Sequence, residues 1–436
     1  MSEATRAPAL RRTLGLWGTT VSGVGIILGA GIYVLIGAAA ADAGGALWAS
    51  FLIAAVLAGA TGLSYAELAA MFPEAGGSAA YAREAFGRRA GFLVGWLLLT
   101  MVVLAAAAVA IGFGGYVDDL LGPDVRPSAA LLIAACAVVV WVGVRETVAI
   151  AVVFTLLEAA GLVLAIVVGL PYLDPGALVD TPRGASGVIA AASLVFFAFT
   201  GFEQMATLAE EAREPARTIP RAMLLAIAIT TALYLLVAVT AVSVIPWREL
   251  AGDTAPLADV VRRAASDRAG DGLAVIALFA TANTVLMLLA TGARLAWGMA
   301  RRGLLPPPFG RLDARRDTPW FATVAVSGAA LAFALSGDIG RVAQLTNVTI
   351  FVAFIVVNAA LVALRLRRPH AVRPFRIGGS VRGVPLTALV GGGAAAVLLA
   401  GADPLVLLAG GGLLLAGLGV SVVALRHELP PADAAA

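Results

Sequence analysis

Three glutamates stand inside long apolar stretches of the sequence and are the first candidates for chemistry. Glu67 lies in "SYAELAA", Glu158 in "FTLLEAAGLV" and Glu203 in "FTGFEQM". A charged side chain at membrane depth is costly, so such residues usually pair with another charge, bind an ion or carry a proton. If these stretches cross a membrane, the three carboxylates are the residues to which ion chemistry should be assigned.

Other reactive side chains are scarce. The single cysteine, Cys136, stands in an apolar run, and the two histidines, His370 and His427, lie in polar segments near the end of the chain. One cysteine can form no internal disulfide and no thiolate cluster for a metal. The sequence has no metal-ligand spacing and no Gly-Lys-Ser/Thr nucleotide loop. We therefore expect no enzyme activity, no cofactor, no metal and no direct use of ATP.

A glycine-rich stretch interrupts the first long apolar segment. It reads "GIILGAGIYVLIG", from Gly25 to Gly37, although glycine costs a helix about 1 kcal/mol relative to alanine. Gly25 and Gly29 are spaced as in a helix-packing notch. A nucleotide-binding glycine loop would need a preceding strand within a soluble βαβ unit, which this sequence does not suggest. The third interpretation is a break in a membrane-spanning helix.

The second half of the chain favours the break. The stretch "SLVFFAFTGFEQM" places Gly201 two residues before Glu203, in a segment five helices after the first one. Paired interruptions of this kind point to a transporter built from inverted repeats. Free N–H groups at a half-helix start suit a carboxylate, and free carbonyl groups suit an ammonium. An α-amino acid carries both groups, so two broken helices would form a site for a zwitterion.

The composition is that of a protein that crosses a membrane many times. Hydrophobic residues make up 61% of the chain and charged residues 13%, whereas soluble domains have about half and about a quarter. A spanning helix needs about 20 mostly apolar residues. We expect an all-α polytopic membrane protein with twelve transmembrane helices, at 14–41, 46–71, 90–117, 128–145, 147–173, 187–209, 220–246, 271–300, 319–337, 338–364, 385–403 and 404–426.

The arginines orient these helices. All basic residues are arginine, and most of them fall in alternate connecting segments on one side, which the positive-inside rule assigns to the cytoplasm. This distribution predicts cytoplasmic ends at 1–13 and 427–436. It also accounts for the net charge of +3 without a nucleic-acid partner, because no basic stripe with interleaved aromatic residues occurs.

Four motifs resemble those of the amino acid/polyamine/organocation (APC) superfamily of transporters. They are "GAGIYVLIG" in the first segment, "SYAELAAMFPEAGGSAAYAREAFG" at 64–87, "FFAFTGFEQMATLAEEAREPARTIPRAM" at 196–223 and "ARLAWGMARRGLLPP" at 293–307. The resemblance runs nearly end to end. It implies a LeuT-type five-plus-five inverted repeat, with helices 1–5 in 14–173, helices 6–10 in 187–364 and two peripheral helices in 385–426.

The resemblance also implies a substrate site at the two interruptions. The substrate carboxylate is expected at backbone N–H groups of the first interruption, which are those of Gly29, Ala30 and Gly31, just after Ile27. The substrate amino group is expected at carbonyl groups of the second interruption, near Phe197, Ala198 and Thr200, beside Gly201.

The pocket wall bears on the kind of substrate. Leu98 and Leu288 fall in this wall by spacing from neighbouring motifs, and both are apolar. No intramembrane aspartate pair awaits a cationic side chain. We therefore expect neutral or apolar amino acids, with cationic amino acids or polyamines as the alternative. Phe197 falls where related exchangers place an aromatic gate, although core or lipid packing would also explain a phenylalanine there.

The resemblance leaves the coupling of transport open. Sodium-independent relatives often carry a lysine on helix 5, where this chain, which has no lysine, has Glu158. Glu158 could load and release a proton, or ligate a sodium ion with Thr284 or Thr291. It could also form a structural ion pair with Arg294 or with an arginine of an inner loop. Proton-coupled uptake and exchange both stay open, and so does a homo-oligomer.

The other two glutamates are candidates for gating. The resemblance ties Glu203 to a gating network, where it would release a proton or brace the half-helix after the break; a hydrogen-bonding role is the alternative. Glu67, at the inner end of helix 2, is expected to pair with inner arginines in an inner gate. Together these inferences predict a secondary active amino acid transporter that works by alternating access in the lipid bilayer of a plasma membrane, specifically a bacterial inner membrane.

Overall fold

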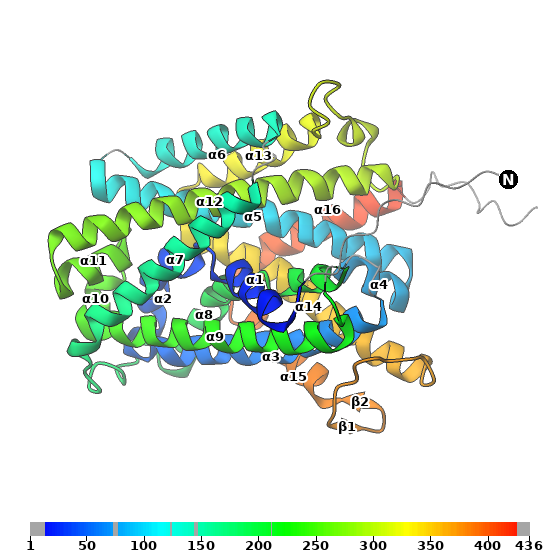
Figure 1. Cartoon of the computed structure of the whole chain (residues 1–436), viewed down its shortest axis with the longest axis horizontal. Helices are drawn as coiled ribbons and strands as arrows, with labels where there is room; N and C mark the ends of the chain where they lie inside the picture. Colours follow the sequence, from blue (N-terminus) through cyan, green and yellow to red (C-terminus); the bar gives the residue numbers. More distant parts are fainter. Residues whose placement is uncertain (1–13, 73–76, 123, 144–146, 211, 425–436) are drawn as a thin grey trace, which may run out of the picture.

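The structure is a computed structural model that describes residues 14–72, 77–122, 124–143, 147–210 and 212–424 (Figure 1). The predicted end segments 1–13 and 427–436 lie outside these residues. Regular structure in the described chain is almost entirely helical. Two short strands, β1 (Ser380–Val381) and β2 (Val384–Pro385), form an antiparallel hairpin in which Val381 is opposite Val384.

The α-helices fall into two groups in chain order. The first group is α1 (Leu16–Leu28), α2 (Gly31–Ala43), α3 (Leu47–Met71), α4 (Ser78–Phe86), α5 (Arg88–Leu121), α6 (Val125–Val142), α7 (Thr147–Gly169), α8 (Gly184–Val195) and α9 (Pro215–Val244). The second group is α10 (Trp247–Leu250), α11 (Pro256–Ala264), α12 (Asp267–Arg301), α13 (Trp320–Ala334), α14 (Ile339–Arg367), α15 (Leu386–Ala400) and α16 (Pro404–Ala424). Short 3-10 helices are η1 (Gly44–Ala46), η2 (Leu170–Tyr172), η3 (Phe196–Phe199), η4 (Phe202–Glu210) and η5 (Pro307–Gly310).

Length and hydrophobicity identify the helices that can cross a membrane. In the described chain, 9 stretches are long and apolar enough to do so, and α1, α13 and α15 are shorter apolar helices. Each predicted segment overlaps at least one described α-helix. The prediction of an all-α polytopic protein is confirmed, and the count of twelve spans stays a prediction.

The polar segment 247–270 is more regular than its composition suggests. It contains the short helix α10 and the amphipathic helix α11. On α11, Leu257, Val260 and Val261 are fully buried, while Arg262 and Arg263 keep part of their side chains in solvent. One apolar stripe is enough to fold such a segment onto the bundle.

Both predicted helix interruptions are present. α1 ends at Leu28, and Gly29, with φ −9° and ψ −178°, turns the chain before α2 begins at Gly31. α8 ends at Val195, after which the chain continues as η3, an extended Thr200 and Gly201. Gly201 has φ +115°, a backbone conformation that favours glycine.

The interrupted helices pack against the longer helices of the bundle. In Figure 1, α1, α2 and α8 lie between α5 and α12 on one side and α3 and α9 on the other. α1 packs against α9, α2 against α8, and α5 against both α12 and α14. Aromatic rings surround the second interruption; they belong to Phe196, Phe199, Phe202, Phe51, Tyr65, Tyr234, Phe351 and Phe354.

Candidate functional site

The two interruptions lie against each other, and each has a glycine at the point of contact. A Cβ atom added at Gly31 would lie 2.8 Å from Cα of Ala198 and 3.1 Å from Cδ1 of Phe197. A Cβ atom added at Gly201 would lie 2.8 Å from the carbonyl oxygen of Ile26. Any larger residue at either position would push the two backbones apart. The structure thus brings the two predicted halves of the site together.

Side chains from two other helices bind the backbone of both interruptions. The hydroxyl of Tyr234, on α9, lies 3.1 Å from the carbonyl oxygen of Ile27 and 2.9 Å from that of Ala198, and donates to both. The N–H of Ala30 donates to Oγ1 of Thr284, on α12, at 3.2 Å. Polar backbone groups freed by a helix break are tolerated in a membrane protein only where such partners or a ligand satisfy them.

Most of the predicted binding residues belong to this contact. Phe197 and Ala198 are buried in it, and the hydroxyl of Thr200 donates to the Phe197 carbonyl at 2.7 Å. Leu98, on α5, and Leu288, on α12, are partly buried against the hydrophobic core. Their part in a pocket wall stays a prediction, as does the role of Phe197 as a gate.

Glu158, on α7, lies beside the first interrupted helix. Its side chain is buried, and its backbone carbonyl accepts a hydrogen bond of 2.5 Å from the hydroxyl of Tyr33, on α2. The carboxylate interacts with the side-chain amide of Asn283, the neighbour of Thr284 on α12. Its Oε1 has no hydrogen-bond partner among the described residues. A buried carboxylate with an unpaired oxygen suits an ion or a proton that binds and leaves.

The other predicted partners of Glu158 are placed differently. Arg294 is exposed on α12, and no ion pair joins it to Glu158 in the part of the chain that the structure describes. Thr284 reaches the first interruption through the Ala30 N–H. Thr291, two turns further along α12, is half-buried, and nothing in the described contacts links it to Glu158.

Glu203 holds the turn of the second interruption. Its Oε2 accepts the N–H of Gly201 at 2.9 Å, and the side chain is buried. Its Oε1 has no hydrogen-bond partner in the described chain. This hydrogen bond fits both a bracing residue and the alternative hydrogen-bonding role, and a part in proton release stays a prediction.

Glu67, on α3, belongs to a buried ion cluster at the predicted inner end. Arg365, on α14, donates to both of its carboxylate oxygens, from Nε to Oε1 at 2.8 Å and from Nη2 to Oε2 at 2.5 Å. Nε of Arg373 lies 3.4 Å from Oε1, and the N–H of Ile377 donates to Oε2 at 2.9 Å. Glu67 therefore pairs with arginines as expected, and the cluster ties α3 to α14 and to the segment after α14.

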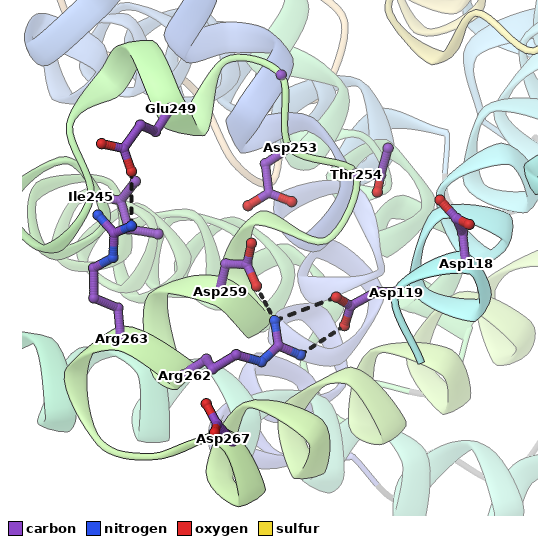
Figure 2. Close-up of a pocket in the computed structure, with 11 residues that line it drawn as sticks. Asp118, Asp119, Ile245, Glu249, Asp253, Thr254, Asp259, Arg262, Arg263 and Asp267 are labelled. Atoms are coloured by element: carbon purple, nitrogen blue, oxygen red, sulfur yellow. Dashed lines mark hydrogen bonds and ion pairs between the residues drawn. The ribbon is translucent and has the colours of Figure 1, made fainter. Parts of the chain in front are cut away.

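An acidic hollow of about 760 Å³ opens at the opposite, predicted outer end (Figure 2). In Figure 2, Arg262 lies between Asp119 and Asp259 and forms ion pairs with both. Arg263 points to Glu249 and forms an ion pair with it. Burial, together with the nearby carboxylates of Asp259 and Asp119, raises the pKa of Asp253 to about 7. The charged lining is mostly acidic and consists of Asp118, Asp119, Glu249, Asp253, Asp259, Asp267, Arg262 and Arg263.

Sequence reasoning missed two tyrosines. Tyr234 binds a backbone carbonyl group of each interruption, and Tyr33, just after the first one, binds the backbone carbonyl group of Glu158. The available signal was a tyrosine inside an apolar run, because a buried hydroxyl nearly always finds a hydrogen-bond partner. That signal does not say which carbonyl the hydroxyl reaches, since the partners lie on other helices.

Comparison with known proteins decides the family. The family model described as amino acid permease matches residues 14–416 of the chain. The chain belongs to the amino acid permease family. This match confirms the resemblance to the APC superfamily that the sequence motifs indicated, and the family is one of transporters.

Curated relatives of the permease carry different solutes. This chain is 29% identical over 393 residues to the branched-chain amino acid permease of Bacillus subtilis. The match covers 85% of this chain and 84% of the Bacillus protein. The chain is 30% identical to the methylthioribose transporter of the same species, covering 86% of each chain. It is 32% identical to the vacuolar cationic amino acid transporter 4 of Arabidopsis thaliana, covering 80% of the permease and 62% of that protein.

A solved structure supports the fold. The permease resembles the crystal structure of a mutant of the manganese transporter from Eremococcus coleocola, with a TM-score of 0.59 over 98% of the permease and 99% of that chain. The two sequences are 14% identical. The likeness therefore concerns the fold alone, and the solute of that protein is not carried over.

Proposed function

We propose that the permease carries amino acids across the membrane as a secondary active transporter that works by alternating access. The observation that carries this proposal is the contact between the two interruptions, where Gly31 and Gly201 let the two backbones meet. N–H groups at the start of α2 suit the substrate carboxylate, and carbonyl groups of the second interruption suit its ammonium. The family supports amino acids as the substrate class.

In the described conformation the protein itself binds part of this site. Thr284 accepts the Ala30 N–H, and Tyr234 donates to the Ala198 carbonyl. A substrate carboxylate at the start of α2 would replace the hydroxyl of Thr284 as the acceptor. The new hydrogen bond would have a charged acceptor and would therefore be stronger than the one it replaces.

We favour neutral or apolar substrates over cationic ones. The predicted wall residues Leu98 and Leu288 are apolar and lie partly buried against the core, and the branched-chain relative supports this class. A cationic amino acid or polyamine is the second candidate. The acidic hollow at the predicted outer end favours it, because a negative vestibule concentrates cations, and so does the relative that carries cationic amino acids.

We propose that a proton is the coupling ion and that Glu158 carries it. The burial of this carboxylate, its unpaired Oε1 and its position beside α2 support the proposal. A sodium ion held by Glu158 and Thr284 is the alternative. Thr284 already accepts the Ala30 N–H, so its remaining lone pair would have to serve the ion. If the protein instead exchanges amino acids without a proton gradient, Glu158 is a structural residue.

We also propose the membrane arrangement that the sequence predicts. It has twelve spans, a five-plus-five inverted repeat with one interrupted helix at the start of each repeat, and both chain ends in the cytoplasm of a bacterium. The position of the breaks in α1–α2 and in α8–η4 supports the repeat. The distribution of arginines supports the orientation.

Uptake into proteoliposomes tests the proposed function. A panel of neutral and cationic amino acids and polyamines would be offered with and without an inward proton gradient, for the wild type, Glu158→Gln and the exposed control Glu214→Gln. Gradient-driven amino acid uptake that is lost in Glu158→Gln alone would support proton symport through Glu158. Amino acid exchange that does not depend on the proton gradient and is unchanged in Glu158→Gln would reject proton coupling through Glu158. Uptake restricted to polyamines would reject amino acids as the substrate.

A further inference from the structure

One face of α14 follows the second interruption along its length. Asn347, Phe351 and Phe354 are spaced by four and three residues, so they lie on the same side of this helix. The ring of Phe196 lies 5.0 Å from that of Phe351, and the ring of Phe202 lies 5.3 Å from that of Phe354, between centroids. These two contacts are apolar, whereas the contact made by Asn347 is polar.

Asn347 binds the end of α8. Its Nδ2 donates to the carbonyl oxygens of Ser193 at 2.6 Å and of Leu194 at 3.0 Å. α8 ends at Val195, and the last four carbonyls of a helix have no partner within it. The asparagine side chain therefore caps this helix end from a neighbouring helix, immediately before the chain turns into the interruption.

The polar contact leaves other polar atoms unpaired. Oδ1 of Asn347 and Oγ of Ser193 are buried and have no hydrogen-bond partner among the described residues. A buried acceptor without a partner destabilises a protein, and a leucine of similar size would introduce none. Packing alone would thus favour an apolar residue at this position, so the amide must contribute something else.

We infer that Asn347 is a positioning residue for the carbonyl groups that receive the substrate ammonium, an inference that rests on the proposed function. By fixing the direction in which α8 ends, the amide sets where the Phe197 and Ala198 carbonyls point. Tyr234 fixes the Ala198 carbonyl from the other side. Without Asn347, α14 holds the start of this segment mainly through ring contacts of Phe196, which tolerate rotation, because Tyr234 and Glu203 bind the segment further along, at Ala198 and Gly201.

The same helix provides a matched control. Asn358 is also a buried asparagine on α14, and its amide donates to Oγ1 of Thr61 at 3.1 Å, while its Oδ1 accepts from Ser64 at 2.7 Å. These contacts join α14 to α3, away from the end of α8. Asn347→Leu and Asn358→Leu therefore remove the same groups from the same helix, and only the first change touches the interruption. Asn347→Ala replaces the leucine variant if leucine does not fit.

The test combines hydrogen exchange without substrate and binding with substrate, both on the full chain in detergent. In Asn347→Leu, backbone amides of residues 196–201 should exchange about tenfold faster than in the wild type, and the best amino acid of the panel should bind about tenfold more weakly. Asn358→Leu should change both values less than about twofold, and Asn347→Gln, which keeps an amide, should recover part of the loss.

Three results would count against the inference or separate it from the proposed function. Unchanged exchange at 196–201 in Asn347→Leu would overturn it, and so would equal losses of binding in Asn347→Leu and Asn358→Leu. If the wild type binds no amino acid, the proposed function fails, while the exchange comparison still decides whether Asn347 holds the interruption.

Discussion

The contact between the two interruptions makes Gly31→Ala the most informative single change. The added methyl group would lie 2.8 Å from Cα of Ala198 and 3.1 Å from Cδ1 of Phe197. The phenylalanine ring can rotate, but the Ala198 backbone cannot move without displacing the second interruption. Overpacking of this kind costs about 1–3 kcal/mol, which corresponds to roughly a 5- to 150-fold loss of substrate affinity if the loss falls on the site. Gly31→Val should abolish binding.

The assay compares Gly31→Ala with Gly59→Ala, a glycine inside α3 whose added Cβ would meet nothing within 4 Å. Alanine is favoured over glycine by about 1 kcal/mol in a helix, so the control should bind normally and be at least as stable. Equilibrium binding of the best labelled amino acid to purified protein gives the affinities, and thermal unfolding gives the stabilities. Normal affinity in Gly31→Ala would refute the reasoning that the two backbones must touch at this residue.

Three further changes test other parts of the structure. Tyr234→Phe removes the hydroxyl shared by two carbonyls and should weaken binding by about 1–3 kcal/mol; equal affinity in a binding assay would contradict this. Glu67→Gln should lower the free energy of unfolding by about 3–5 kcal/mol, whereas Glu84→Gln, which changes a partly exposed glutamate, should lower it by less than about 1 kcal/mol; similar thermal shifts in the two variants would contradict the cluster. Because the pKa of Asp253 is raised to about 7, the wild type should lose stability relative to Asp253→Asn as pH rises through about 7; parallel unfolding curves between pH 4.5 and 8.5 would contradict this.

The helix interruptions could be predicted because glycine marks them in the sequence. Gly201 adopts a backbone conformation that favours glycine, Gly29 stands between α1 and α2, and the buried Glu203 follows Gly201. A local pattern was sufficient because a break is a local property of the chain. The reciprocal contact of Gly31 with Ala198 and of Gly201 with Ile26 could not be predicted, since it depends on how distant helices pack.

The partners of charged and polar groups were predictable in kind and not in identity. The sequence indicated that Glu67 would meet arginines, but the choice of Arg365 and Arg373 depends on the path of the segment after α14. Arg294 was a reasonable partner for Glu158 by its place in an apolar helix, yet its side chain is exposed. Helical periodicity does not fix the rotation of a helix that is apolar on all sides, so the facing residues could not be deduced.

The most direct test of the two-interruption site is a structure of the permease with a bound amino acid. The substrate carboxylate should lie about 3 Å from N–H groups of residues 29–31, and its ammonium should lie at the same distance from carbonyl groups of residues 197–200. In this complex the Ala30 N–H should point to the substrate and no longer to Thr284. An amino acid bound instead in the acidic hollow beside Asp253, with both interruptions unchanged, would contradict the assignment of the site.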